Sequence, residues 1–183
     1  MFRLIFITLI LLINVTACTT EMPSAPYCRA QQQPIELPNT THNTNTAGCL
    51  IRFEHQALLI THRFSQRLDI PGGSTKNNES LACAAHRETF EETGLNVEVL
   101  FPVTQTKNGM IIFACLADDI LDITQLPRPT PTFSQGESLQ LALFDLFDLE
   151  QDSLRFADDL VPFRDAFTAT PPSTPVSMNI IHH

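Results

Sequence analysis

Residues 73–95 read GSTKNNESLACAAHRETFEETGL, and this stretch carries the strongest structural signals in the chain. Good helix formers follow Ser80, whose side chain can begin a helix, and Gly94 stands where a helix can end in the left-handed conformation. The preceding residues 70–73, Ile-Pro-Gly-Gly, are a strong turn signal. The stretch therefore predicts a tight glycine turn that leads into a helix over residues 80–93.

Three carboxylates lie on one face of this predicted helix. Glu88, Glu91 and Glu92 are spaced i, i+3 and i+4, so their charges repel one another unless a cation lies among them. Oxygen ligands suit hard divalent cations, Mg²⁺ above all and also Mn²⁺. Mg²⁺ usually completes its shell with water and substrate phosphate, so the pattern indicates a phosphate-handling site without a basic pocket. A solvated acidic helix face is the alternative.

The same residues resemble the Nudix hydrolase signature, G-x(5)-E-x(7)-R-E-U-x-E-E-x-G-U, in which U is a bulky apolar residue. The matching positions are Gly73, Glu79, Arg87, Glu88, Glu91, Glu92, Gly94 and Leu95. Thr89 departs from the pattern at the first U position. Because threonine is isosteric with valine, this departure affects packing and leaves the carboxylates in place.

The resemblance implies a fold and an activity. It implies an α+β fold, a Nudix-like α/β/α sandwich with a mixed sheet and a catalytic helix after a Gly-Gly loop. The expected activity is Mg²⁺-dependent hydrolysis of a diphosphate linkage in a small molecule, such as a nucleoside diphosphate linked to another moiety. The chain is thus expected to be a Nudix-type pyrophosphohydrolase.

The resemblance also assigns residue roles. The expected metal ligands are the carboxylates of Glu88, Glu91 and Glu92 and the backbone carbonyl of Gly72. Glu79 and Arg87 would orient this carboxylate cluster. For Arg87 the alternative is a simple salt bridge on the helix.

The proton acceptor and the substrate contacts are less well defined by the sequence. Members of the family often use an acidic residue from a later loop, and Glu137 is the candidate here, as a further metal ligand or as the base. Glu91 is the other candidate base, and an ordinary exposed loop residue is the alternative for Glu137. Arg63, at the end of a predicted strand, and Gly73 are the candidate substrate contacts; for Arg63 the alternative is an exposed strand end.

Apolar runs predict the remaining elements. Strands are expected over residues 48–53, 57–62, 96–103, 110–117 and 139–144, and a loop over 126–132. Apolar residues spaced by 4, 3 and 4 predict an amphipathic helix over 156–167. The mixture of strands and helices without strict alternation favours the same fold class.

The N-terminus has the layout of an export signal. An apolar run of about a dozen residues follows Arg3, and Val15-Thr16-Ala17-Cys18 resembles a bacterial lipobox, in which the cysteine is lipidated. The expected organisation is a signal peptide over 1–17, a polar linker from lipidated Cys18 over 18–47, a hydrolase domain over 48–168 and a disordered tail over 169–183. An ordinary cleaved signal is the alternative.

Charge and lipidation together define the expected partners. The formal net charge is -9, which argues against a nucleic-acid partner. A lipidated Cys18 would anchor the domain in the bacterial cell envelope, facing the periplasm. Thr19, rather than an aspartate, favours the outer over the inner membrane.

The other four cysteines would meet an oxidising compartment after export. Cys28 and Cys49 flank the polar linker, and a bridge between them is one expectation. Cys83 and Cys115 fall in a helix pattern and a strand pattern, where buried free thiols are expected.

Two other functions remain open. The chain is alternatively a lipid-anchored binding or sensing module that has lost turnover, or a hydrolase of a lipid or isoprenoid diphosphate. Proximity to the membrane motivates the second of these.

Overall fold

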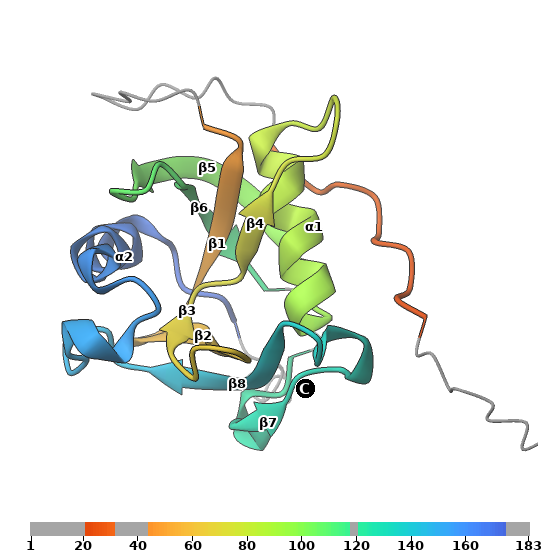
Figure 1. Ribbon diagram of the computed structural model, residues 1–183. Helices are drawn as coiled ribbons and strands as arrows, with labels where there is room; N and C mark the ends of the chain where they lie inside the picture. Colours follow the sequence, from red (N-terminus) through yellow and green to blue (C-terminus); the bar gives the residue numbers. More distant parts are fainter. Residues whose placement is uncertain (1–20, 32–43, 118–120, 175–183) are drawn as a thin grey trace, which may run out of the picture.

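The computed structural model of the chain describes residues 21–31, 44–117 and 121–174 (Figure 1). The expected signal peptide and Cys18 lie outside these residues. Among the described helices, none has both the length and the apolar character needed to cross a bilayer.

The described strands form one mixed sheet, in the order β5-β6-β1-β2-β8-β7. These strands are β5 Glu98–Gln105, β6 Ile111–Leu116, β1 Thr46–Phe53, β2 Gln56–His62, β8 Ser138–Phe144 and β7 Arg128–Pro129. Strands β1 and β6 pair in parallel, and the other pairs are antiparallel. Two short strands, β3 Leu68–Asp69 and β4 Gly72–Ser74, pair with β2 and β1 respectively.

Strands β1 and β2 pair only beside their connecting turn and then diverge, as Figure 1 shows. The first half of β1 pairs with β4 instead, which brings Gly72 against Gly48. A Cβ built on Gly72 would lie 2.6 Å from the Gly48 Cα, so only glycine allows this approach. The divergence therefore fixes the glycine turn against the middle of the sheet.

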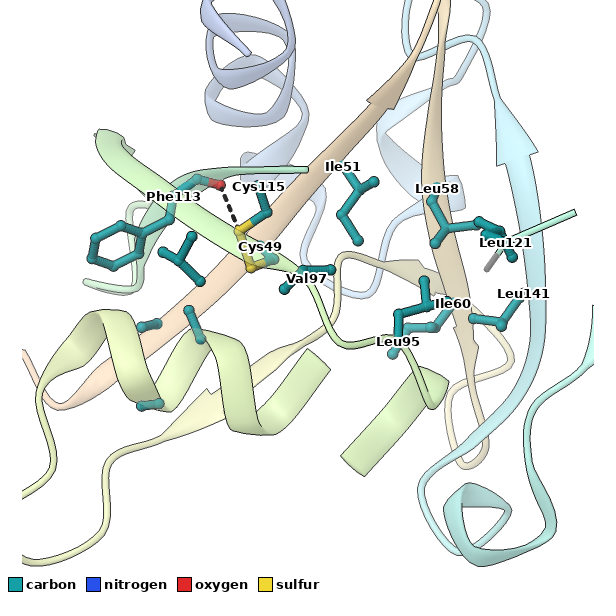
Figure 2. Close-up of a cluster of buried hydrophobic side chains, with 14 of the residues drawn as sticks. Cys49, Ile51, Leu58, Ile60, Leu95, Val97, Phe113, Cys115, Leu121 and Leu141 are labelled. Carbon is teal, nitrogen blue, oxygen red and sulfur yellow. Dashed lines mark hydrogen bonds between the residues drawn. A yellow bond between two sulfur atoms is a disulfide. The ribbon is translucent and has the colours of Figure 1, made fainter. Parts of the chain in front are cut away.

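Two helices cover the two faces of the sheet. The helix α1, Leu81–Thr93, packs through Ala84 and Ala85 on a core that includes β1, β5 and β6 residues (Figure 2). The helix α2, Leu160–Ala169, packs through Phe163 on the core of the opposite face. This arrangement confirms the predicted α+β layered fold with a mixed sheet.

The predicted elements are present, with a few differences at their ends. The five predicted strands correspond to β1, β2, β5, β6 and β8, and the predicted 80–93 helix to α1. The proline-rich 126–132 segment, expected to be a loop, contains the short strand β7. The predicted 156–167 helix divides into a 3-10 turn, Ala157–Asp159, and α2.

The described part of the C-terminal segment packs on the domain, where a disordered tail was expected. Ser173 is buried; its backbone N–H donates to the Arg52 carbonyl at 2.7 Å, and its hydroxyl accepts from the Ala117 N–H at 3.0 Å. Order thus extends beyond α2 to residue 174.

The disulfides differ from the expected Cys28–Cys49 bridge, which is wrong. The structure pairs Cys28 with Cys83 and Cys49 with Cys115. Cys49 and Cys115 lie on the neighbouring strands β1 and β6 and are both fully buried (Figure 2). The expectation of free thiols at Cys83 and Cys115 is therefore wrong as well.

Candidate active site

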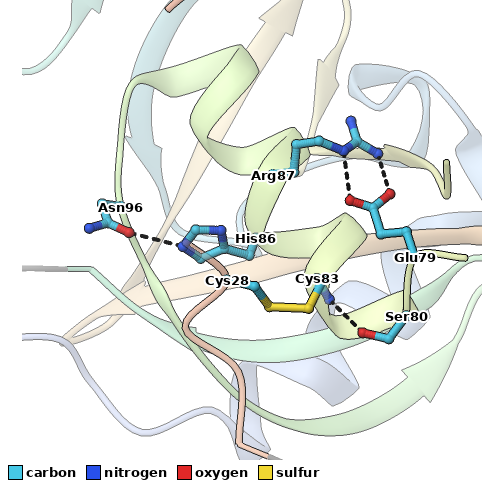
Figure 3. The surroundings of a disulfide bond; sticks show 7 residues. All are labelled: Cys28, Glu79, Ser80, Cys83, His86, Arg87 and Asn96. Carbon is cyan, nitrogen blue, oxygen red and sulfur yellow. Dashed lines mark hydrogen bonds and ion pairs between the residues drawn. A yellow bond between two sulfur atoms is a disulfide. The ribbon is translucent and has the colours of Figure 1, made fainter. Parts of the chain in front are cut away.

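The helix α1 is fixed at both ends. The Ser80 hydroxyl accepts from the Cys83 N–H at 3.2 Å and thereby satisfies one of the free donors of the first turn (Figure 3). Gly94 follows the helix with φ of +77°, the left-handed conformation that glycine adopts without strain, and donates to the Phe90 carbonyl. The acidic side chains of α1 thus project from a helix that begins and ends at defined residues.

Arg87 is the centre of the charged network on this helix. Its guanidinium donates to both carboxylate oxygens of Glu79 at 2.8 Å (Figure 3). It also donates to Glu88 at 2.7 Å, Glu91 at 2.9 Å and the Ser74 carbonyl at 2.7 Å. The Arg87 hydrogen bonds hold the pKa of Glu79 below its usual range. Arg87 is itself buried, so these contacts form a desolvated network rather than a surface salt bridge.

Glu88 and Glu92 are carboxylates in an unfavourable environment. Burial raises the pKa of Glu92 well above its usual value, and the charges of Asp69, Glu88 and Glu137 raise it further. Burial also raises the pKa of Glu88, against the lowering effect of Arg87. Glu92 accepts one hydrogen bond from the Gly72 N–H at 2.8 Å. Both groups would therefore be stabilised as anions by additional positive charge.

The glycine turn keeps space for Glu88. A Cβ built on Gly73 would lie 2.5 Å from the carboxyl carbon of Glu88, a distance that real Cβ atoms do not adopt. The signature therefore requires glycine at position 73, because any side chain there would collide with the Glu88 carboxylate.

Glu137 faces the helix from the loop before β8. The Ser134 hydroxyl donates to the Glu91 carbonyl at 2.6 Å, which fastens this loop to α1. On the other side, the Glu137 carbonyl accepts from the Arg63 N–H at 2.8 Å. The structure thus brings the late acidic residue chosen from the sequence to the same site as the helix carboxylates.

These elements enclose a cleft of about 720 Å³. It is lined by Met22, His62, Phe64, Gly72, Gly73, Ser74, Lys76, Arg87, Glu88, Glu91, Glu92, Phe133, Ser134, Gly136, Glu137 and Arg155. The cleft also contains three cationic side chains, those of Lys76, Arg87 and Arg155, beside its four carboxylates. The Lys76 ammonium lies 3.1 Å from Glu91, and Arg155 extends from the segment before α2.

Arg63 and His86 are not among the residues that line this cleft. The Arg63 guanidinium donates to the Gln135 carbonyl at 2.7 Å, so its side chain holds the Glu137 loop. His86 is buried and pairs with the Asn96 side chain at 2.9 Å (Figure 3). His62 does line the cleft, and burial lowers its pKa.

A second cavity of about 230 Å³ shares Gly72, Gly73 and Arg155 with the cleft. Asp69 and Asp159 contribute carboxylates to it, and Asn108, Met110 and Phe156 contribute other parts of its lining. The Asp159 Oδ1 atom is buried and has no hydrogen-bond partner among the described residues. The cavity therefore combines apolar side chains with a carboxylate, Asp159, that has one unpaired oxygen among the described residues.

The donor set of the cleft fits a hard divalent cation. Within the described ranges, no three acidic, histidine or cysteine side chains converge as metal ligands. Arg87 accounts for this, because one of its nitrogens bonds both Glu88 and Glu91. The carboxylates that would hold a cation are those of Glu88, Glu91 and Glu92, two of which have raised pKa values through burial and mutual repulsion.

Comparison with known proteins defines the family. Residues 42–160 match the NUDIX domain family, which is more than half of the chain. The chain belongs to the Nudix family and is a Nudix-type diphosphate hydrolase. Nudix hydrolases generally use divalent metals such as Mg²⁺ and act on small-molecule diphosphates. No curated protein sequence matched the chain.

Solved structures share the fold at low sequence identity. A NUDIX hydrolase from Nitrosomonas europaea is 22% identical with a TM-score of 0.51, over 73% of this chain and 79% of that chain. An ADP-ribose pyrophosphatase from Streptococcus suis is 19% identical with a TM-score of 0.51, over 70% and 96%. A UDP-X diphosphatase is 16% identical with a TM-score of 0.52, over 74% and 68%.

Proposed function

We propose that this protein hydrolyses the diphosphate linkage of a nucleoside diphosphate joined to another moiety, with Mg²⁺, in the bacterial cell envelope. The observation that carries the proposal is the cleft, which is lined by Glu88, Glu91 and Glu92 of α1, by Glu137 and by three cationic side chains. Two of the structural neighbours are named for nucleoside diphosphate compounds, which supports the substrate class.

The residues of the chain have distinct roles in this proposal. Glu88, Glu91 and Glu92, with the Gly72 carbonyl, would hold a divalent cation, which supplies positive charge to the diphosphate oxygens. Lys76 and Arg155 line the same cleft and would bind the phosphates as cations.

The attacking water needs a proton acceptor. Glu91 and Glu137 both line the cleft, and either carboxylate is placed to take the proton. Arg87 is occupied by five hydrogen bonds to Glu79, Glu88, Glu91 and Ser74, which suits a positioning role. The second cavity, which shares Gly72, Gly73 and Arg155 with the cleft, offers room for a group attached to the diphosphate.

The envelope location is part of the same proposal. The signal peptide and Cys18 lie outside the described residues, so the proposal rests on their sequence pattern. Two disulfides in a chain of this size support an oxidising compartment, because disulfides rarely persist in the reducing cytosol.

A substrate panel tests the activity. The full chain is assayed for phosphate-ester release from ADP-ribose, UDP-glucose and dinucleoside diphosphates, with Mg²⁺, with Mn²⁺ and with chelator. We expect turnover of at least one compound with metal and none with chelator. Absence of turnover across the panel under every metal condition would falsify the proposal for these nucleoside substrates.

Substitution of a cleft carboxylate tests the site. Glu91→Gln removes a charge that lines the cleft, so we expect activity to fall by about 10²–10⁴-fold. The melting temperature should stay close to that of the wild type, because Glu79 and Glu88 still pair with Arg87. Glu150→Gln, at an exposed position outside the cleft, is the matched control and should retain activity. Full turnover by Glu91→Gln would remove Glu91 from the machinery.

A further inference from the structure

An N-terminal strap, residues 21–31, is fastened along the catalytic helix. Cys28 forms a disulfide with Cys83 in the first turn of α1 (Figure 3). Beside it, the Val99 N–H donates to the Arg29 carbonyl at 2.8 Å, and the Gln31 N–H donates to the Val99 carbonyl at 2.9 Å. The strap is thus held by one covalent bond and by pairing with the outer edge of β5, and Figure 1 shows it passing beside α1.

The strap leads to the rim of the cleft. Met22 lines the cleft and leaves 47% of its surface exposed. Phe64, in the turn between β2 and β3, lines the same cleft and is 79% exposed. Two large apolar side chains from distant parts of the sequence are therefore exposed to solvent at the mouth of a site for a charged diphosphate.

The disulfide shortens the connection to the proposed lipid anchor. A free linker from Cys18 to Thr46 would have a root-mean-square span of about 30 Å. Instead, Cys28 is fixed ten residues after Cys18, and Met22 follows Cys18 by four residues. Four residues reach at most about 14 Å, and the polar headgroup layer is itself about 5–8 Å thick. If Cys18 carries the lipid, this short connection would hold the cleft mouth next to the bilayer surface rather than away from it.

We propose that the active site opens onto the membrane, and that its substrate is a lipid-linked diphosphate whose apolar chain remains in the bilayer. The proposal rests on the proposed diphosphate hydrolysis and on lipidation of Cys18. Met22 and Phe64 contact the lipid-water boundary, and the diphosphate enters the cleft between them from the membrane side. The Cys28–Cys83 disulfide sets this orientation.

The chemical step is the hydrolysis already proposed for the site. A water oxygen bonds to one phosphorus and gives a proton to a cleft carboxylate. The bond from that phosphorus to the bridging oxygen breaks, and this oxygen leaves with the other phosphate. The products are two monophosphates, one of which stays in the bilayer with its lipid chain.

The orientation is tested without reference to activity. The chain contains no tryptophan, so Phe64→Trp gives a single fluorescent reporter at the cleft mouth. The full lipidated variant is placed in vesicles whose lipids carry bromine in the upper acyl chain. We expect the emission of Phe64→Trp to shift to the blue and to be quenched.

Phe147→Trp, at an exposed apolar residue outside the cleft, is the control and should keep its emission. In the Cys28→Ser/Cys83→Ser background, the quenching at position 64 should become weaker. Equal emission at positions 64 and 147 overturns the proposal.

The substrate class is tested in the same vesicles. CDP-diacylglycerol is the lipid-linked probe, and the soluble compound turned over in the nucleoside panel is the bulk probe. Without the disulfide, the strap is held by hydrogen bonds such as the two main-chain bonds to Val99. When they open, the connection lengthens from ten to 28 residues, which lowers the effective concentration of the site at the surface by about fivefold. We expect Cys28→Ser/Cys83→Ser to lose about that factor on CDP-diacylglycerol and to retain its rate on the soluble compound.

The outcomes separate the two proposals. Turnover of a soluble diphosphate without turnover of CDP-diacylglycerol overturns the membrane-facing site and leaves diphosphate hydrolysis intact. Absence of turnover of CDP-diacylglycerol and of every compound in the nucleoside panel overturns the proposed function itself. An equal loss on both probes shows that the disulfide supports the fold of α1 rather than its orientation, and this overturns the role assigned to the strap.

Discussion

Arg87 compensates for the charge that the helix carboxylates would otherwise carry alone. It is buried beside Glu79, Glu88 and Glu91 and bonds all three. A pair of exposed surface charges would contribute little to stability, but removing one partner from a buried network leaves an uncompensated charge. The cluster of Glu79, Glu88 and Glu91 is therefore stable without a bound metal, because Arg87 lies within it and neutralises part of its charge.

Adding a single methyl group at Gly73 should disturb the active site. In Gly73→Ala the added Cβ would collide with the Glu88 carboxylate and displace it. Since a misplacement of about 1 Å near reacting groups can cost about a hundredfold in rate, we expect kcat/KM to fall by about that factor.

Gly136→Ala is the comparison for this substitution. A Cβ built on Gly136 meets no atom within 4 Å, although this residue lies in the same cleft. Its kcat/KM should stay much closer to that of the wild type. Similar losses in the two variants would show that Gly73 does not act through Glu88.

At the scale of the element, the caps of α1 determine where its carboxylates lie. Ser80→Ala removes the acceptor for the Cys83 N–H, and we expect the free energy of unfolding to fall by about 0.5–2 kcal/mol in chemical denaturation. Ser80→Asp supplies another acceptor and should recover most of this loss. If Ser80→Ala and Ser80→Asp are equally stable, the hydroxyl does not cap the helix.

The two disulfides belong to different elements and should differ in accessibility. Cys28 lies on the exposed strap, whereas Cys49 and Cys115 are fully buried between β1 and β6. Because thiol exchange requires access to a sulfur atom, we expect mild reductant to release Cys28 and Cys83 first.

Thiol alkylation followed by peptide mass spectrometry measures this order. Cys49 and Cys115 should become labelled only when denaturant is added. Simultaneous labelling of all four cysteines in the folded protein would contradict the assigned pairs or their burial.

The sequence predicts the elements of this fold better than it predicts their distant contacts. Apolar periodicity and the Ser80 and Gly94 caps are local signals, and they place α1 and the long strands. Strand β7 was missed because Pro129 argues against a strand, although proline is compatible with an edge position such as this. The cysteine pairs were missed because no local pattern reports which strands become neighbours.

In the candidate site, too, the residues of a local motif could be predicted from the sequence, and those brought in from distant segments could not. The spacing of Glu88, Glu91 and Glu92 is local and brings them to one cleft as expected. Lys76 and Arg155 were missed as site residues because isolated cations carry no motif. Lys76 could have been suspected from its place between the glycine turn and Glu79, whereas nothing in the sequence places Arg155 there.

At the scale of the whole molecule, a buried carboxylate links stability to pH. Burial raises the pKa of Asp69 to about 7, despite Arg155 at 3.7 Å. Between the usual value of 3.8 and about 7, the folded state holds more protons than the unfolded state. This contribution therefore makes the free energy of unfolding decrease as the pH rises through that range.

Asp69→Asn tests this dependence by denaturation at a series of pH values. The amide can still accept the Ile70 N–H bond and carries no charge, so the decrease between about pH 4 and 7 should become shallower. Asp152→Asn, at an exposed carboxylate, is the control and should retain the slope of the wild type. An unchanged slope in Asp69→Asn would show that this carboxyl does not titrate in the range.

The pairing of Arg29 and Gln31 with Val99 has a consequence for association between molecules. Strand β5 is at the end of the sheet, and these two residues occupy main-chain groups that would otherwise be free. A shortened protein that begins at β1 would expose β5 as an unpaired edge strand. Exposed edge strands can pair with strands of other molecules and cause aggregation. The strap thus covers part of a sheet edge that would otherwise be open to pairing with another chain.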